Sequence, residues 1–99
     1  MAELLNNLGR RIVRGDYAVE SLLPAEAELC RIYSVGRNSA REAIKTLSGK
    51  QLVHTVQGIG TVVLPREEWN LFDPLVLQWR FDDPHEEFAL TEELTHLRR

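Results

Sequence analysis

Residues 35–47 read VGRNSAREAIKTL and combine a cationic stripe with an apolar face. Arg37, Arg41 and Lys45 recur at every fourth residue, which places them on one slowly rotating side of a helix. Four apolar side chains lie roughly 120° around the same helix, at about 100° per residue; they are Ala40, Ala43, Ile44 and Leu47. The pattern therefore predicts a helix that buries one face and presents three cations on another.

The ends of this helix are indicated by short polar residues and glycines. Gly36 can act as its N-cap, and Ser39 with Glu42 also fits a capping box, so both starts stay open. The helix is expected to run to about residue 48 and to be closed by Gly49.

Two further helices are expected before it. An apolar stripe at spacings of three and four predicts a first helix over about residues 3–14, ended by Gly15. A second, short helix follows, with Pro24 in its first turn and its end near Ser34. Glu26 and Glu28 are expected to favour the positive end of its helix dipole. Only about three residues then separate the second and third helices, which is typical of a helix-turn-helix. Tyr17 and Leu22, in the segment between the first two helices, are expected to pack in the core.

A hairpin is predicted directly after the third helix. Residues 52–56 and 61–64 are rich in β-branched side chains, and the sequence QGIG at 57–60 separates them. Pro65 ends the second strand. The order helix, helix, helix, strand, strand predicts an α+β fold: a winged helix-turn-helix of three helices plus a β-hairpin wing, followed by a linker and a partial helix.

The charge divides the chain at the end of this hairpin. Residues 1–65 carry eight Lys or Arg and six Asp or Glu, a net charge of +2; residues 66–99 carry four and nine, a net charge of −5. We therefore expect a winged-helix domain over residues 1–65 and a linker with the start of another domain over residues 66–99. The second part is rich in aromatic residues, is interrupted by Pro74 and Pro84, and looks helical from Glu86 to Arg99. It is too short for its own core and is expected to pack on the winged helix, on a second copy or on a further domain.

Composition excludes several classes of protein. The chain has 99 residues, 43% of them hydrophobic, with no long apolar run and no signal peptide, so we expect neither a membrane protein nor a large enzyme. The single cysteine, Cys30, suits a reducing cytoplasm. His54, His85 and His96 are not spaced as metal ligands, and no nucleophile–base pair is convincing. We expect no catalytic residues, metal or cofactor.

The third helix has side chains of the types that contact bases and phosphates in DNA. The major groove of B-DNA admits a helix, and the N-terminal residues of such a helix reach base edges. Arginine matches the paired acceptors of guanine and asparagine those of adenine, while serine and lysine more often touch phosphate. The candidate contacts are Arg37, Asn38, Ser39, Arg41 and Lys45, with Gly58 at the hairpin tip bringing the backbone close to phosphate or the minor groove. Three basic residues alone would be read as a solvated face, but the turn before them and the hairpin after them favour DNA.

Three linked motifs resemble the GntR family of bacterial transcriptional regulators. Residues 23–29, LPAEAEL, resemble its LPsEreLa helix, residues 35–44, VGRNSAREAI, its VSRttVReAL segment, and residues 57–63, QGIGTVV, its qGsGtfV wing. Residues 69–79, WNLFDPLVLQW, are similar to the WNllDpdVLrW junction of a subfamily with an all-helical effector domain, which includes galactonate-repressor-like regulators of sugar-acid genes.

The resemblance implies a regulator that binds a pseudo-palindromic operator in double-stranded DNA as a homodimer. The DNA-contacting arginines of the family fall on Arg37 and Arg41, its small polar pair on Asn38 and Ser39, and its wing glycine on Gly58. Its small-molecule effector would bind only in a C-terminal domain absent from these residues, so a fragment or a truncated regulator is expected.

Two departures affect affinity and sequence preference: Ala27 replaces a DNA-contacting arginine, and Gly36 replaces a serine or threonine. The alternative function is a winged-helix module for protein interaction or dimerisation, without an operator of its own.

Overall fold

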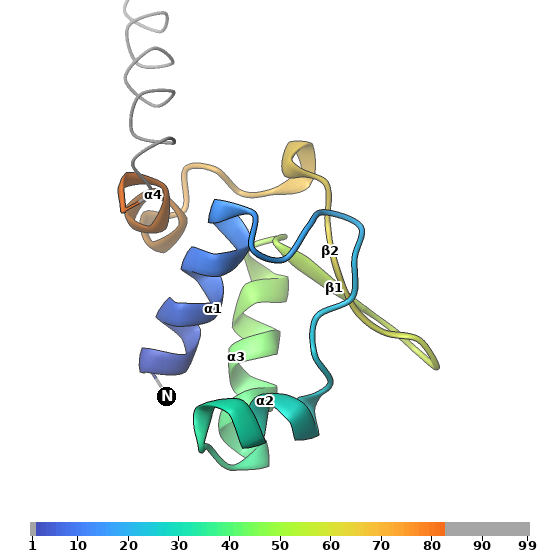
Figure 1. The fold of residues 1–99 in the computed structure, drawn as a ribbon. Helices are drawn as coiled ribbons and strands as arrows, with labels where there is room; N and C mark the ends of the chain where they lie inside the picture. The colour runs from blue at the N-terminus through green and yellow to red at the C-terminus, as the bar shows by residue number, and fades with distance from the viewer. Residues whose placement is uncertain (1, 83–99) are drawn as a thin grey trace, which may run out of the picture.

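The computed structural model describes residues 2–82 and confirms the winged helix-turn-helix (Figure 1). The elements are α1 (Ala2–Arg14), α2 (Glu26–Tyr33), α3 (Arg37–Gly49), β1 (Val53–Val56), β2 (Gly60–Val63), the 3-10 helix η1 (Arg66–Glu68) and α4 (Pro74–Phe81). Predictions for residues 83–99, including the helix expected from Glu86, lie outside the described residues.

The start of α2 differs from the prediction. Pro24 was expected in its first turn, but the helix begins at Glu26 with Ala25 as its N-cap. The reason lies in the preceding segment, which is held extended along β2: the Leu23 N–H donates to the Thr61 carbonyl at 2.8 Å. This backbone pairing keeps the chain out of helical conformation until it has passed the proline.

Both ends of α3 are settled by the structure. Gly36 is the N-cap, with φ −78° and ψ 166°, so the helix does not start at Ser39. The expected stop at Gly49 is wrong, because Gly49 is still helical and Gln51 takes the left-handed conformation, with φ +62°. The Leu52 N–H donates to the carbonyl of Leu47 and that of Gln51 to Ser48, at 3.1 and 3.0 Å, which is a Schellman motif. Both leucines are buried, and their packing accounts for the tolerance of a non-glycine residue there.

The hairpin is antiparallel; β1 begins one residue later than predicted and ends as predicted, and β2 lies one residue earlier in the sequence. Val53 pairs with Val63 and Val56 with Gly60. Val53 and Val63 are buried and join the wing to the helical core. Leu22, which was expected in the core, is instead 53% exposed; it lies beside β2, where it forms an isolated antiparallel bridge with Val62.

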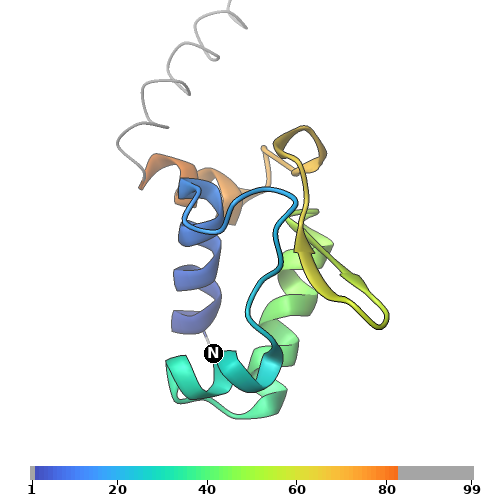
Figure 2. The ribbon, with the colours of Figure 1, turned by 45° about the vertical axis from the view of Figure 1, so that its right-hand side comes forward.

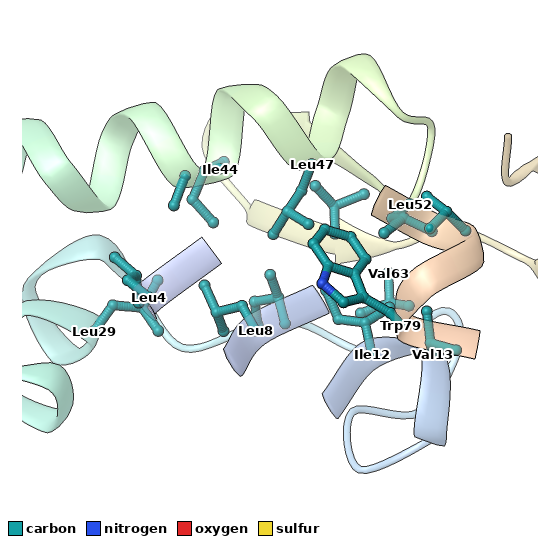
Figure 3. Close-up of a cluster of buried hydrophobic side chains, with 14 of the residues drawn as sticks. Leu4, Leu8, Ile12, Val13, Leu29, Ile44, Leu47, Leu52, Val63 and Trp79 are labelled. Carbon is teal, nitrogen blue, oxygen red and sulfur yellow. The ribbon is translucent and has the colours of Figure 1, made fainter. Parts of the chain in front are cut away.

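The core lies where α1, α2, α3 and the base of the hairpin meet (Figure 3). Leu4, Leu8 and Ile12 supply the buried stripe of α1, as their spacing predicted. The facing stripe of α3 is also buried and consists of Ala40, Ala43, Ile44 and Leu47. Each large aliphatic side chain buried here contributes about 1.5–3 kcal/mol relative to exposure.

The described part of the segment after the hairpin, residues 66–82, packs onto the winged helix, the first of the three expected alternatives. Figures 1 and 2 show α4 beside α1, at the end opposite α2. Trp79 of α4 is buried and its Nε1 donates to Asn6 Oδ1 of α1 at 3.1 Å. Pro74 does not interrupt the segment but begins α4, because Asp73 caps it by accepting from the amides of the first turn.

Gly9 of α1 is what lets Trp79 approach. A Cβ atom built at Gly9 would lie 2.5 Å from the Trp79 ring. We expect Gly9→Ala to lower the free energy of unfolding by about 1–3 kcal/mol, because overpacking outweighs the gain in helix propensity. Urea titration followed by tryptophan fluorescence and circular dichroism measures the change.

Gly49→Ala is the matched control, since among the described residues a Cβ there would point into open space, and its φ is not positive. It should raise the free energy of unfolding by up to about 1 kcal/mol. Equal stability of the two variants would contradict the packing of Trp79 over Gly9.

A part-buried ion pair connects the end of α3 to the start of α4. Lys50 Nζ lies 3.0 and 2.9 Å from the two carboxylate oxygens of Asp73. Burial by itself would raise the pKa of Asp73, but hydrogen bonds from Lys50 and from the Val76 and Leu75 amides hold it below its ordinary value of 3.8. The ionised group therefore stabilises the fold above about pH 4, and this contribution is lost as the pH falls through the lowered folded-state pKa.

Asp73→Asn tests this assignment, because asparagine is also a good N-cap but carries no charge. We expect the variant to be less stable at pH 7 by about 1–3 kcal/mol, since Lys50 loses its counter-ion. It should also lose less stability than the wild type between about pH 5 and pH 2. Asp82→Asn, at the exposed end of α4, removes the same charge without removing the partner of Lys50 and is the control for the loss of stability at pH 7. Parallel pH profiles of Asp73→Asn and wild type would refute the role of the pair.

Candidate nucleic-acid interface

The outward face of α3 brings the predicted contact residues together. The side chains of Arg37, Asn38, Arg41 and Lys45 are exposed, and Ser39 is half-buried at the first turn. The opposite face of the helix is almost completely removed from solvent. Burial of the apolar face fixes the rotation of α3 about its axis. Packing of the core therefore holds the cationic side chains on the solvent side of the helix.

A groove separates this helix from the wing. It has a volume of about 580 Å³ and lies between the start of α2, the start of α3 and the hairpin. Arg37 and Glu26 line its helical side, and Thr61 and Ile59 line the side of the wing. The wing and the N-terminal end of α3 therefore flank one open channel.

The wing tip is a glycine turn with an apolar side chain between the glycines. The Ile59 N–H donates to the Val56 carbonyl at 3.0 Å, which closes the turn. Gly58 has φ +80° and Gly60 φ +133°, conformations that favour glycine. Gly58 is exposed, and Ile59 is the most exposed large hydrophobic side chain of the wing at 64%. The tip can thus approach another surface through both backbone and an aliphatic group.

The basic residues of α3 differ in whether a carboxylate lies near them. Arg41 lies near a carboxylate of α2: its Nε is 3.7 Å from Oε1 of Glu26, and both side chains are half-exposed. Within the part of the chain that the structure describes, no carboxylate lies within ion-pair distance of Arg37 or Lys45. These two cations are available to a polyanion, whereas Arg41 is already partly compensated.

The pairing of Glu26 with Arg41 was not predicted. From sequence, Glu26 was interpreted only as a residue that stabilises the start of α2 through the helix dipole. The two residues are 15 positions apart, and only the crossing of α2 and α3 brings them together. Their opposite charges are visible in the sequence, but no spacing rule connects them.

The basic residues of α1 are engaged locally. Arg10 Nε donates to the Asn6 carbonyl at 3.3 Å and Arg11 Nε to Asn7 Oδ1 at 3.0 Å. Arg14 pairs with Asp16, and this hydrogen bond lowers the pKa of the Asp16 carboxyl. These contacts favour a solvated helix end over a second DNA surface.

Residues 2–82 offer no grouping of three or more histidine, cysteine or carboxylate side chains that could hold a metal ion. His85 and His96 lie outside them. None of the helices in this part of the chain is long and apolar enough to cross a membrane. Cys30 is half-buried against the core, as expected for a small apolar filler.

Comparison with known proteins places this geometry in a family. The family described as "Bacterial regulatory proteins, gntR family" matches residues 2–63. The galactonate operon transcriptional repressor of Escherichia coli (strain K12) is 42% identical over 79 residues, which are 80% of this chain and 34% of that protein. The HTH-type transcriptional regulator YieP of the same bacterium is 41% identical over 76 residues, 77% of this chain and 33% of that protein. The chain thus spans about a third of the length of these relatives.

Among solved structures, S. agalactiae BusR in complex with its busA-promotor DNA superposes with a TM-score of 0.64. The match covers 99% of this chain and 52% of that one at 20% identity, so it concerns the fold alone. The family match, by contrast, extends over all three helices and both strands of the winged helix. The chain belongs to the gntR family of bacterial regulatory proteins.

Proposed function

We propose that this chain is the sequence-specific DNA-binding part of a transcriptional regulator, with α3 in the major groove and the wing at the minor groove or the backbone. One observation carries the proposal: α3 exposes Arg37, Arg41 and Lys45 while its opposite face is buried. A helix held in this orientation, beside a projecting hairpin, is shaped to present its N-terminal residues to base edges.

The roles follow from side-chain chemistry. Arg37 and Arg41 carry planar donor forks that match the O6 and N7 acceptors of guanine, and Asn38 can pair with adenine. Ser39 and Lys45 are assigned to phosphate contacts, which fix the position of the helix on the duplex. Gly58 brings backbone close to the phosphate or the minor groove, since its position at the tip is exposed.

The whole regulator is proposed by analogy with its relatives. Residues 1–65 form the DNA-binding domain, and residues 66–99 lead into an effector domain that binds a small molecule. The similarity to a repressor of a galactonate operon supports repression of sugar-acid or related genes. We place such a protein in the cytoplasm, as a homodimer on a pseudo-palindromic operator, without enzymatic activity or a cofactor.

Exposed aromatic side chains favour one alternative, an interaction or dimerisation module. Phe72, just before α4, and Phe81, its last residue, are 64% and 49% exposed. Sedimentation of the chain and of a Phe72→Ser, Phe81→Ser variant discriminates: a dimer that dissociates in the variant would support self-association, and an unchanged mass would remove it.

The proposal is tested by selection from randomised duplexes of about 20 base pairs, which accommodate two half-sites one helical turn apart. The wild-type chain should enrich one sequence at low salt. Binding should weaken steeply between about 50 and 200 mM salt, because phosphate contacts release counterions. No enrichment and no binding at the lowest salt would refute the proposed function.

Arg37→Ala and Lys45→Ala should have different effects. Loss of Arg37 should reduce the preference for the selected duplex, at a cost of about 1–3 kcal/mol at that base. Loss of Lys45 should weaken all duplexes alike and reduce the salt slope by about 1. Fluorescence anisotropy with selected and random duplexes measures both quantities. Equal, uniform losses would contradict the assignment of Arg37 to a base.

A further inference from the structure

Glu26 is the acidic side chain at a surface proposed to meet a polyanion. It is the first residue of α2 and, among residues 2–82, the only acidic residue that lines the groove between the helices and the wing. Its side chain is 42% exposed. A carboxylate in this place opposes the approach of phosphates, so it weakens the nonspecific attraction that cations of α3 exert on any duplex.

The geometry of the contact between Glu26 and Arg41 indicates which edge of the guanidinium stays accessible. Glu26 Oε1 faces Nε of the guanidinium at 3.7 Å. A guanidinium is a rigid, planar fork with donors on more than one edge. A carboxylate on the Nε side therefore leaves the terminal Nη edge available for a second, bidentate partner. The O6 and N7 atoms of guanine are such a partner.

The contact also restricts a flexible side chain. The Arg41 side chain is 63% exposed, so binding must immobilise a long chain that is otherwise mobile. The Glu26 carboxylate of the neighbouring helix limits the orientations of the Arg41 side chain before DNA binds. Part of the conformational entropy cost of ordering this side chain is therefore incurred already in the free protein. The same carboxylate reduces the net charge that Arg41 offers to a phosphate in a wrong register.

We propose that Glu26 is a positioning residue that determines specificity: it orients Arg41 for a base edge and disfavours phosphate contacts of the same arginine. This inference rests on the proposed DNA-binding function and deepens it. Glu28, two positions further along α2, provides the contrast. It pairs with Arg31 of its own helix and does not line the groove.

The experiment compares Glu26→Gln with Glu28→Gln, which remove the same charge from the same helix. Both variants are titrated by fluorescence anisotropy against the duplex selected by the wild-type chain and against a random-sequence duplex, between about 50 and 200 mM KCl. Circular dichroism confirms that each variant is folded. The ratio of the two dissociation constants is the measure of specificity.

Glu26→Gln should bind the random duplex several-fold more tightly, with a salt slope steeper by up to about 1, because Arg41 becomes free to neutralise a phosphate. Its specificity ratio should fall by about 5- to 10-fold, in the range of one imperfect base contact. Glu28→Gln should change neither dissociation constant by more than about twofold, as expected of an exposed pair.

A second arm separates positioning from bulk charge. In an Arg41→Ala background, Glu26→Gln should leave the specificity ratio unchanged, because the residue it orients is gone. Three results would overturn the inference: an unchanged ratio in Glu26→Gln, equal effects of Glu26→Gln and Glu28→Gln, or the same loss of ratio with and without Arg41. Failure of the wild type to bind any duplex would instead refute the proposed function itself.

Discussion

Burial of one face of α3 is the constraint on which the rest of the structure depends. Ala40, Ala43, Ile44 and Leu47 are removed from solvent against α1, α2 and β1, so α3 cannot rotate without exposing them. Two of these residues are alanines, which let the neighbouring helices approach closely. The cationic stripe is therefore fixed in direction by apolar packing, and its own charges need not stabilise the fold. This division explains how a chain with a net charge of −3 can carry a local cationic surface.

The same helix is tied at its far end to residues 66–82, which follow the hairpin. Lys50, the C-cap of α3, binds the N-cap of α4 through its side chain, and its carbonyl accepts from the Asn70 N–H at 3.0 Å. Trp79 then anchors α4 over Gly9 of α1. Two contacts of different chemistry, one ionic and one apolar, thus join the linker to the winged helix. The linker could not be displaced without disturbing the residue that ends α3.

Sequence periodicity was sufficient for the helices and the hairpin, because the stripes of α1 and α3 are local patterns. Periodicity failed where contacts outside the local pattern determine the structure. The pairing of residues 20–23 with β2 displaced the start of α2, and the Schellman motif at Gln51 replaced the expected stop at Gly49. The helix α4 was missed, although Asp73 followed by Pro74 is a start signal, because the proline was interpreted as an interruption. The exposed face of α3 was predictable from spacing, whereas the pair Glu26–Arg41 was not.

The alanine at position 27, where the family motif has an arginine, changes the charge around Glu26. The family motif places an arginine where this chain has Ala27, and that exposed position also lines the groove. With alanine there, the start of α2 contributes a carboxylate to the groove and no cation, and among the described residues that line the groove the cation is Arg37 of α3. A DNA-binding protein that makes few phosphate contacts depends more heavily on base contacts for its affinity. In the proposed complex, this balance of charge would favour discrimination over tight general binding, with Arg41 as the residue that Glu26 contacts.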